Sequence, residues 1–309
     1  WLAEELAERR GGRLIEVQHH LAHAAAVLAE HGRLPAPGQT ALVMTMDGTG
    51  WGPDQSAWGG EWVLVKGDLS WERAGHLEPM ALVGGEAAVR EPWRIAVAAV
   101  ADAGSGELLA KTPMARMIPA DRLEQISRLA AERPWPQASG AGRLFEACGA
   151  LLGLATVNRF EGEAAICLEA HAAASGMVPW EEVGLWDNST VLPSASLLVA
   201  AARRAAAGEP TDRIAAGFHE TFCRLAGAVT RRILEHTSPS ATLAATGGCL
   251  VNRRLRSGLR TEIAAPLLLP MRLPPGDGGL AYGQAVVTAA CLARGIDAAA
   301  LLAPESITT

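Results

Sequence analysis

The spacing of hydrophobic residues near the start of the chain predicts a strand, a helix and a hairpin. Residues 12–18, "GRLIEVQ", alternate polar and apolar side chains as a short strand does. Residues 19–31 place apolar side chains at helical spacing before a glycine ends the run. An apolar run at 40–48 and a second one at 56–69 flank a Gly-rich segment, which predicts two antiparallel strands joined by a turn.

The remainder of the chain alternates between helical and strand patterns. We expect helices at 92–102, 121–131, 142–154, 161–175 and 280–293, and strands at 242–248 and 266–270. This alternation in both halves predicts an α/β fold with two lobes. A Pro- and Trp-containing break at 132–137 divides them, so we expect a first lobe at 1–135 and a second at 136–309, with the final helix packing back on the first.

Composition excludes several classes of protein. The chain has 309 residues, of which 49% are hydrophobic, and a net charge of −6, as expected of a globular protein that does not bind nucleic acids generally. Its five cysteines are widely spaced without C-x-x-C, which disfavours a disulfide framework or a zinc ribbon and favours a cytoplasmic location. Its apolar stretches are too short or too charged to cross a membrane.

Three histidines lie within five positions in "VQHHLAH", residues 17–23. On a helix, residues four apart share a face, so His19 and His23 present imidazoles to one point while His20 projects elsewhere. Neutral imidazole nitrogens are good ligands for transition metals. An isolated H-x-x-x-H is more often a pair of surface or capping histidines, and two histidines do not complete a site. A metal site here therefore requires carboxylates from elsewhere in the chain.

Two aspartates are placed to supply those carboxylates. Asp47 ends an apolar run and opens "DGTGWG". In that turn Gly48 and Gly50 let backbone N–H groups converge on an anion, and Thr49 adds a hydroxyl. Asp277 lies in "PPGDGG", just before a predicted helix. A single Asp-Gly is usually an ordinary turn, but two of them, each after an apolar strand, favour a functional interpretation.

A glycine pair in "TGGCLVNRRL" suits a nucleotide at a helix N-terminus. Gly247 and Gly248 end a predicted strand, which would let phosphate or a nucleoside approach the next helix without side-chain obstruction. We expect Asn252 about one turn into that helix, where it can bond a base or sugar edge. A tight connection between strand and helix explains the glycines almost as well. Cys249 has no visible activating partner, so we interpret it as a small packed residue.

Two further predicted helices begin with residues that could contact a ligand. In residues 139–154, a Gly-rich start that includes Gly142 precedes Arg143 and Glu146, which can contact a phosphate and a ribose hydroxyl. The alternative is a solvent-facing ion pair worth a few tenths of a kcal/mol. We expect Glu161 in the first turn of the following helix, where the helix dipole favours carboxylates whatever their function, and where it can also touch the ligand.

The order of these motifs resembles a known family. The series "VQHHLAH", "MDGTGWGPDQSAWGGEW", "GGEAAVREPWR", "GAGRLFEACGALLG", "EGEAAICLEA", "GGCLVN" and "PPGDGGLAYGQA" is similar to the C-terminal carbamoyltransferase region of HypF-type hydrogenase maturation proteins. It resembles more distantly the antibiotic O-carbamoyltransferases and the TsaD-type tRNA-modifying enzymes. The likeness extends over about residues 14–292.

The resemblance implies an actin-like (ASKHA) two-lobed fold, with ATP or carbamoyladenylate and a metal in the cleft between the lobes. It implies Fe(II) or Zn(II) as the metal, with Mg(II) able to accompany the nucleotide. The residues that match the metal-binding and catalytic positions are His19, His23, Asp47 and Asp277. The residues expected to face the nucleotide are Gly48, Thr49, Gly50, Gly142, Arg143, Glu146, Glu161, Gly247, Gly248 and Asn252.

The implied reaction is carbamoyl transfer from carbamoyladenylate to the C-terminal cysteine of a HypE-like partner, which leads to the cyanide ligand of [NiFe]-hydrogenase. A YrdC-like domain, in cis or in trans, would make the carbamoyladenylate. We expect the first lobe to lack its initial strands. Two positions depart from the family pattern, because Gly140 stands where a serine is usual and Glu146 where an aspartate is usual.

Two other functions fit many of the same motifs. The first is carbamoylation of a small-molecule hydroxyl, for which the metal and nucleotide motifs would look alike. The second is a non-catalytic ATP-binding scaffold that docks a partner. Binding of ATP and carbamoyladenylate without consumption of either would distinguish a scaffold from the enzymes.

Overall fold

A single mixed sheet organises the computed structural model, which describes residues 2–132, 134–172, 178–186, 189–237 and 240–304. The sheet runs in the order β4-β5-β2-β1-β7-β8, with β3 pairing with β2 and β6 with β3. Its strands are β1 (Thr40–Trp51), β2 (Ala57–Lys66), β3 (Trp71–Leu77), β4 (Met80–Ala81), β5 (Gln137–Ala138), β6 (Val191–Leu192), β7 (Thr242–Thr246) and β8 (Leu267–Leu268). The predicted α/β class is confirmed.

Strand β1 lies at the centre of this sheet. It pairs with β2 in an antiparallel hairpin whose register shifts between Met46 and Gly50, and with β7 in parallel. Both faces of the strand are covered, which explains why its sequence is a nearly continuous apolar run. Because Thr45 is opposite Thr246, the part of β1 just after Thr45 and the loop that follows β7 lie side by side.

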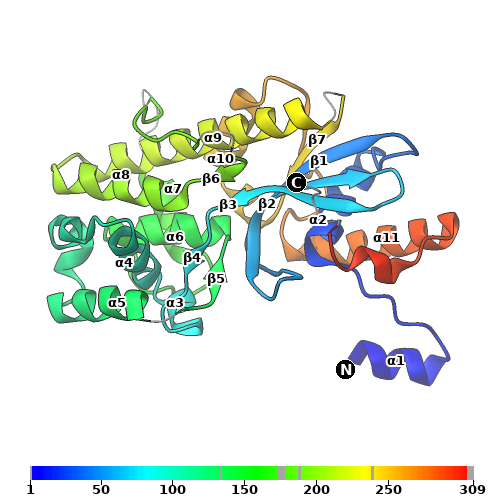
Figure 1. Ribbon diagram of the computed structural model, residues 1–309, viewed down its shortest axis with the longest axis horizontal. Helices are drawn as coiled ribbons and strands as arrows, with labels where there is room; N and C mark the ends of the chain where they lie inside the picture. Colours follow the sequence, from blue (N-terminus) through cyan, green and yellow to red (C-terminus); the bar gives the residue numbers. More distant parts are fainter. Residues whose placement is uncertain (1, 133, 173–177, 187–188, 238–239, 305–309) are drawn as a thin grey trace.

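Helices cover both faces of the sheet and build a separate helical half (Figure 1). They are α1 (Leu2–Arg10), α2 (His19–Glu30), α3 (Glu86–Arg90), α4 (Trp93–Asp102), α5 (Ala120–Glu132), α6 (Ala141–Leu151), α7 (Glu163–His171), α8 (Ser194–Ala206), α9 (Thr211–His236), α10 (Arg253–Glu262) and α11 (Leu280–Arg294). Figure 1 shows α4 to α8 grouped on one side, α2 and α11 beside the strands, and α1 apart from the main body. None of these helices is both long and apolar enough to traverse a lipid bilayer.

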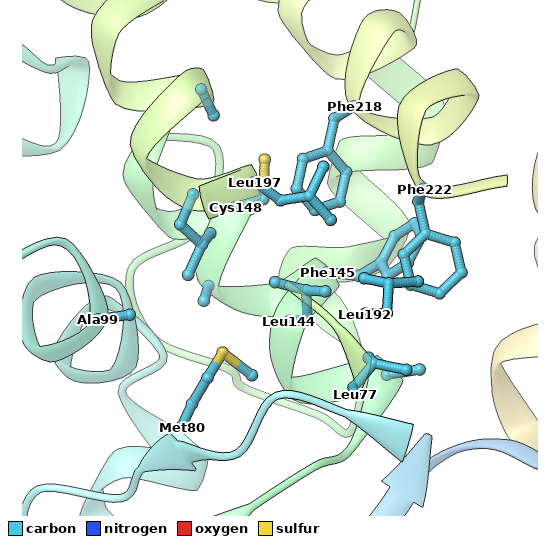
Figure 2. Close-up of a cluster of buried hydrophobic side chains, with 14 of the residues drawn as sticks. Leu77, Met80, Ala99, Leu144, Phe145, Cys148, Leu192, Leu197, Phe218 and Phe222 are labelled. Atoms are coloured by element: carbon cyan, nitrogen blue, oxygen red, sulfur yellow. The ribbon is translucent and has the colours of Figure 1, made fainter. Parts of the chain in front are cut away.

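The larger hydrophobic cluster joins the helical half to one face of the sheet. At its centre Phe145 of α6 meets Phe218 and Phe222 of α9 edge to face, with ring centroids 5.3 and 5.0 Å apart (Figure 2). Leu77 of β3 and Met80 of β4 lie in the same cluster. This packing fixes α6, whose first turn reaches the candidate site, against the strands.

The smaller cluster lies between the other face of the sheet and the pair α2 and α11. Leu21 and Leu28 of α2 pack in it with Val43 of β1. Helix α11 approaches α2 so closely that a Cβ on Gly283 would overlap the carbonyl oxygen of Ala22. The last helix is therefore held on a helix from the start of the chain. The lobe boundary at 135/136 stays a prediction.

Several predicted elements differ from the structure. Residues 12–18 are extended but pair with no described strand, so the predicted strand is wrong. The predicted strand at 56–69 ends at Lys66, and β3 follows it as a strand that the patterns did not predict. The strand expected at 266–270 pairs only at Leu267–Leu268. The helix expected at 161–175 spans Glu163–His171, while its residues 173–175 and residue 133 of the predicted break lie outside the described residues.

A buried carboxylate ties β2 and β3 to the segment that leads into α6. Glu61 is fully buried, and its Oε2 accepts a hydrogen bond of 2.6 Å from Arg73 Nε. Its Oε1 accepts bonds from Ser139 Oγ at 2.5 Å and from the backbone N–H groups of Gly59 and Gly60 at 3.1 and 3.3 Å. The Glu61 carboxylate accepts all of these hydrogen bonds, so its removal takes an acceptor away from each of these donors.

Replacement of Glu61 should therefore destabilise the fold strongly. We expect Glu61→Ala to lower the free energy of unfolding by about 3 kcal/mol or more, because the partly buried Arg73 loses its closest ion partner and the donors of Ser139, Gly59 and Gly60 lose their acceptor. Glu132→Ala, which removes an exposed pair with Arg128 on α5, should cost about 0.5 kcal/mol or less. Urea denaturation of both variants measures the difference. Equal losses would show that the Glu61 network contributes little.

Candidate active site

Four side chains that are candidate metal ligands meet at one point. They are His19 and His23 of α2, Asp47 of β1 and Asp277 before α11, and one ligand atom of each lies within 4.8 Å of all the others. Asp47 Oδ2 is 3.4 Å from His19 Nε2 and 3.3 Å from His23 Nε2. Asp277 Oδ1 is 3.8 and 3.4 Å from the same two nitrogens. The histidines and aspartates identified from the sequence are thus brought together by the fold.

Local structure explains this convergence. The four-residue spacing places His19 and His23 on one face of α2, as predicted. Asp47 lies where the pairing of β1 with β2 is interrupted, so its side chain is free to turn toward α2. The backbone N–H of Gly248, after β7, donates to Asp47 Oδ1 at 3.0 Å. This bond occupies one carboxylate oxygen and leaves the other facing the two imidazoles.

The electrostatics of the cluster suit a divalent cation. His23 is 1% exposed, and its Nε2 has no hydrogen-bond partner among the described residues. Burial alone raises the pKa of Asp47, but the two neighbouring imidazoles and the bond from the Gly248 N–H hold that pKa well below its usual range. Two neutral nitrogens and two carboxylates are a ligand set for Fe(II), Zn(II) or Mn(II), so the residues fit the metal that the motifs imply.

A cavity of about 340 Å³ opens beside these four side chains. Asp47 and Asp277 line it together with residues of α6, α7 and the start of α10. The predicted ligand residues that line it are Gly48, Thr49, Gly142, Arg143, Glu146, Glu161, Gly248 and Asn252. The cavity therefore joins the candidate metal ligands to most of the residues expected to contact a nucleotide.

Two of the glycines predicted to contact the ligand, Gly50 and Gly247, pack closely against neighbouring chain segments. Gly50 does not line the cavity, because it lies against the imidazoles of α2, where a Cβ would come within 2.5 Å of His19 Cδ2. Gly247 has a φ of +102°, and a Cβ there would overlap the backbone of Met46. Both positions require glycine for close contact between chain segments, and their assignment to the nucleotide stays a prediction.

Arg143 and Glu146 form a buried pair inside the cavity and not the solvent-facing pair that was the alternative. Their side chains are 4% and 1% exposed, and Arg143 Nη1 is 2.8 Å from Glu146 Oε2. The two atoms do not meet in hydrogen-bond geometry, and Arg143 Nε also has no partner among the described residues. Burial raises the pKa of Glu146 to about 7, although the Arg143 charge and a bond from Asn158 oppose the shift.

Asn252 is fixed at the cavity edge by two bonds. It precedes α10 as its N-cap and does not lie one turn into the helix, which corrects the prediction: its Oδ1 accepts from the Leu255 N–H at 2.9 Å. Its Nδ2 donates to Nε2 of His219 at 3.0 Å. Burial lowers the pKa of His219 to about 4, so this imidazole is neutral and its Nε2 can accept. His219 was not predicted, because it lies far from Asn252 in the sequence.

The remaining candidates in the cavity wall differ in role. Glu161 lines the cavity but precedes α7, so it is not in the first helical turn as predicted. Cys249 also lines the cavity, and burial raises the pKa of its thiol. A thiol that stays protonated is a poor nucleophile, in agreement with its interpretation as a small packed residue.

A further residue positions the loop that carries Asp277. Glu30, at the end of α2, accepts hydrogen bonds from the backbone N–H groups of Met271, Arg272 and Leu273 at 3.1, 2.5 and 3.1 Å. The adjacent His31 bonds the carbonyl oxygen of Leu269 at 2.9 Å. These contacts hold the segment before Asp277 on α2. No sequence pattern could reveal them, because the partners of Glu30 are backbone groups more than two hundred residues away.

The raised pKa of Glu146 predicts a pH-dependent stability. Between about pH 4.5 and 7 the unfolded chain releases a proton that folded Glu146 retains, so this group lowers the free energy of unfolding as the pH rises. We expect Glu146→Gln to become more stable relative to the parent over that range, by about 1–3 kcal/mol. Urea denaturation at several pH values measures this difference. A difference that is constant with pH would contradict the shift.

Known proteins match both the sequence and this fold. Residues 43–284 match the family described as carbamoyltransferase, Kae1-like domain, second subdomain. The chain is 40% identical over 290 residues to carbamoyltransferase HypF of Rhodobacter capsulatus, covering 93% of this chain and 37% of that protein. It is 39% identical to a carbamoyltransferase HypF homolog of Cupriavidus necator, covering 93% of this chain and 74% of the homolog.

Solved structures of HypF proteins match the fold of this chain. Full-length HypF in a phosphate- and nucleotide-bound form matches with a TM-score of 0.78 and 28% identity, covering 90% of this chain and 43% of that one. HypF of T. kodakarensis shares the fold, with a TM-score of 0.80 at 24% identity over 97% of this chain and 40% of the other. The predicted actin-like, two-lobed α/β fold is confirmed. The chain thus belongs to the Kae1-like carbamoyltransferase domain family of HypF proteins.

Proposed function

We propose that this chain transfers a carbamoyl group from carbamoyladenylate to the C-terminal cysteine thiol of a HypE-like acceptor protein, in maturation of [NiFe]-hydrogenase. The observation that carries the proposal is the convergence of His19, His23, Asp47 and Asp277 at the edge of the cavity. The family membership supports carbamoyl transfer as the reaction type. The described cysteines are all unpaired, which agrees with a cytoplasmic reaction.

The cavity suits a nucleotide anhydride. Arg143 is buried and incompletely paired, so it can donate to a phosphate oxygen. Gly48 and Gly142 both line the cavity, and glycine at each position leaves no side chain between the backbone and a ligand. The nucleotide-bound state of a related HypF structure agrees with ATP or carbamoyladenylate as the ligand. We infer that a YrdC-like domain, in cis or in trans, supplies the carbamoyladenylate.

Residues of this chain would bind and orient the reactants. His19, His23, Asp47 and Asp277 would hold Fe(II) or Zn(II), which as a Lewis acid stabilises negative charge on a carbamoyl or phosphate oxygen. The C–O bond of the mixed anhydride breaks, a C–S bond forms with the acceptor thiol, and AMP leaves. The thiol comes from the acceptor, because Cys249 stays protonated in the wall of the cavity.

Transfer can be tested directly by mass spectrometry. We expect the acceptor protein, incubated with this chain, carbamoyladenylate and Fe(II) or Zn(II), to gain one carbamoyl group on its C-terminal cysteine. His23→Ala should abolish the gain because a ligand is lost. His171→Ala, which changes an exposed histidine on α7, should keep it. Nucleotide binding without any gain would favour the scaffold function, and a gain on an added small-molecule hydroxyl would favour O-carbamoylation.

Metal content provides an independent test. We expect the parent chain to bind one Zn(II) per molecule, and His23→Ala to weaken that binding by about 100-fold or more, since loss of a group that merely orients a ligand already costs about 10- to 100-fold. Elemental analysis after gel filtration measures the stoichiometry. Far-UV circular dichroism checks that the variant remains folded. An unchanged zinc content in His23→Ala would contradict the ligand assignment.

A further inference from the structure

One amide side chain connects the helix that carries the two histidines to the strand that carries Asp47. Gln18 directly precedes α2 and is 7% exposed. Its Oε1 accepts from the backbone N–H groups of His20 and Leu21 at 2.6 and 3.0 Å. Its Nε2 donates to the carbonyl oxygen of Trp51 at 3.0 Å and lies 3.1 Å from Nδ1 of His20. Every hydrogen-bonding position of this amide is therefore used.

The orientation of the amide is determined by its partners. The oxygen must face the two N–H groups of α2, because the nitrogen cannot accept from them. The nitrogen then faces Trp51 and His20, so Nδ1 of His20 accepts and the imidazole keeps its proton on Nε2.

The bond to Trp51 acts at the end of β1, a few residues after Asp47. The neighbouring Gly50 lies so close to α2 that an added Cβ would come within 2.8 Å of the imidazoles of both His19 and His20. Helix α2 and the end of β1 are thus joined next to the candidate ligands. A change in their separation would change the distances of 3.4 and 3.3 Å between Asp47 and the two histidines.

We propose that Gln18 is a positioning residue that sets the spacing between the histidines of α2 and Asp47. This inference rests on the proposed metal site. Capping of α2 requires only the side-chain oxygen of Gln18, which accepts from the helix N–H groups. The connection to β1 requires the side-chain nitrogen, which must reach the carbonyl oxygen of Trp51. The two roles can therefore be separated by a shorter amide.

Gln18→Asn makes this separation. Asparagine is a good N-cap, so the cap of α2 is retained, but its side chain is one methylene shorter and cannot also reach the carbonyl oxygen of Trp51. The matched control is Gln39→Asn, which shortens an exposed glutamine before β1 that accepts from the Ala36 N–H. A second reference is Phe222→Leu, which destabilises the core of the helical half and lies on α9, a helix that carries none of the four candidate ligands.

The test measures the Zn(II) dissociation constant, by competition with a chromophoric chelator, and the unfolding free energy of the metal-free protein. We expect Gln18→Asn to weaken zinc binding about 10- to 100-fold, as for other residues that orient metal ligands. Its metal-free stability should fall no further than that of Phe222→Leu, and both Gln39→Asn and Phe222→Leu should bind zinc like the parent.

The outcomes separate this inference from the proposed function. Parental zinc affinity in Gln18→Asn would overturn the positioning role of Gln18 while the metal site stands. If Phe222→Leu weakens zinc binding as much as Gln18→Asn does, Gln18 acts on zinc binding only through the stability of the fold. That result would also overturn the positioning role. Failure of the parent to bind zinc, or any Fe(II) or Mn(II) offered instead, would overturn the metal site and the inference together.

Discussion

Strand β1 pairs with β7 in parallel from Ala41 opposite Thr242 to Thr45 opposite Thr246, so the residues that follow these pairs lie side by side at the same edge. Asp47 and Gly248 each lie two residues after the last pair, and the Gly248 N–H bonds the Asp47 carboxylate. The cavity and the four candidate ligands are arranged around this meeting point. Without the parallel register, residues from the two ends of the chain would have no common site.

The buried charged groups near this edge differ in how fully they are hydrogen-bonded. Asp47 is stabilised as a carboxylate by the imidazoles and the Gly248 N–H, whereas Arg143 and Glu146 remain incompletely bonded inside the cavity. A buried polar group without a partner is unfavourable in the free protein, and a ligand that supplies the missing partners removes that cost. The incompletely bonded groups that line the cavity therefore lower the free energy of unfolding of the ligand-free protein.

Sequence patterns predicted the elements whose side chains pack periodically. The ends of α2, α4 and α6 fall close to those expected, because their buried faces repeat at helical spacing. Strand β3 was missed because Glu72, Arg73 and His76 interrupt its apolar pattern, although pairing with β2 makes it a strand. Residues 12–18 alternate like a strand but find no neighbouring strand to pair with.

For the site, residue identity was predictable but many contacts were not. His19, His23, Asp47 and Asp277 stand in recognisable motifs, and the fold brings them together. The roles of Gln18, Glu30 and His219 depend on backbone groups or side chains distant in sequence, so no local pattern reveals them. Asn252 was placed within a helix because its capping bond to Leu255 is a property of the folded loop.

The close packing of α11 on α2, with Gly283 against Ala22, has a consequence for the order in which the chain folds during synthesis. Helix α2 and strands β1 and β2 leave the ribosome before β7, Asp277 and α11, which come much later in the chain. Until these emerge, the apolar face of α2 and one edge of β1 lack their native neighbours, and such surfaces favour aggregation. The half of the molecule that contains the candidate ligands is therefore completed only after α11 has been synthesised.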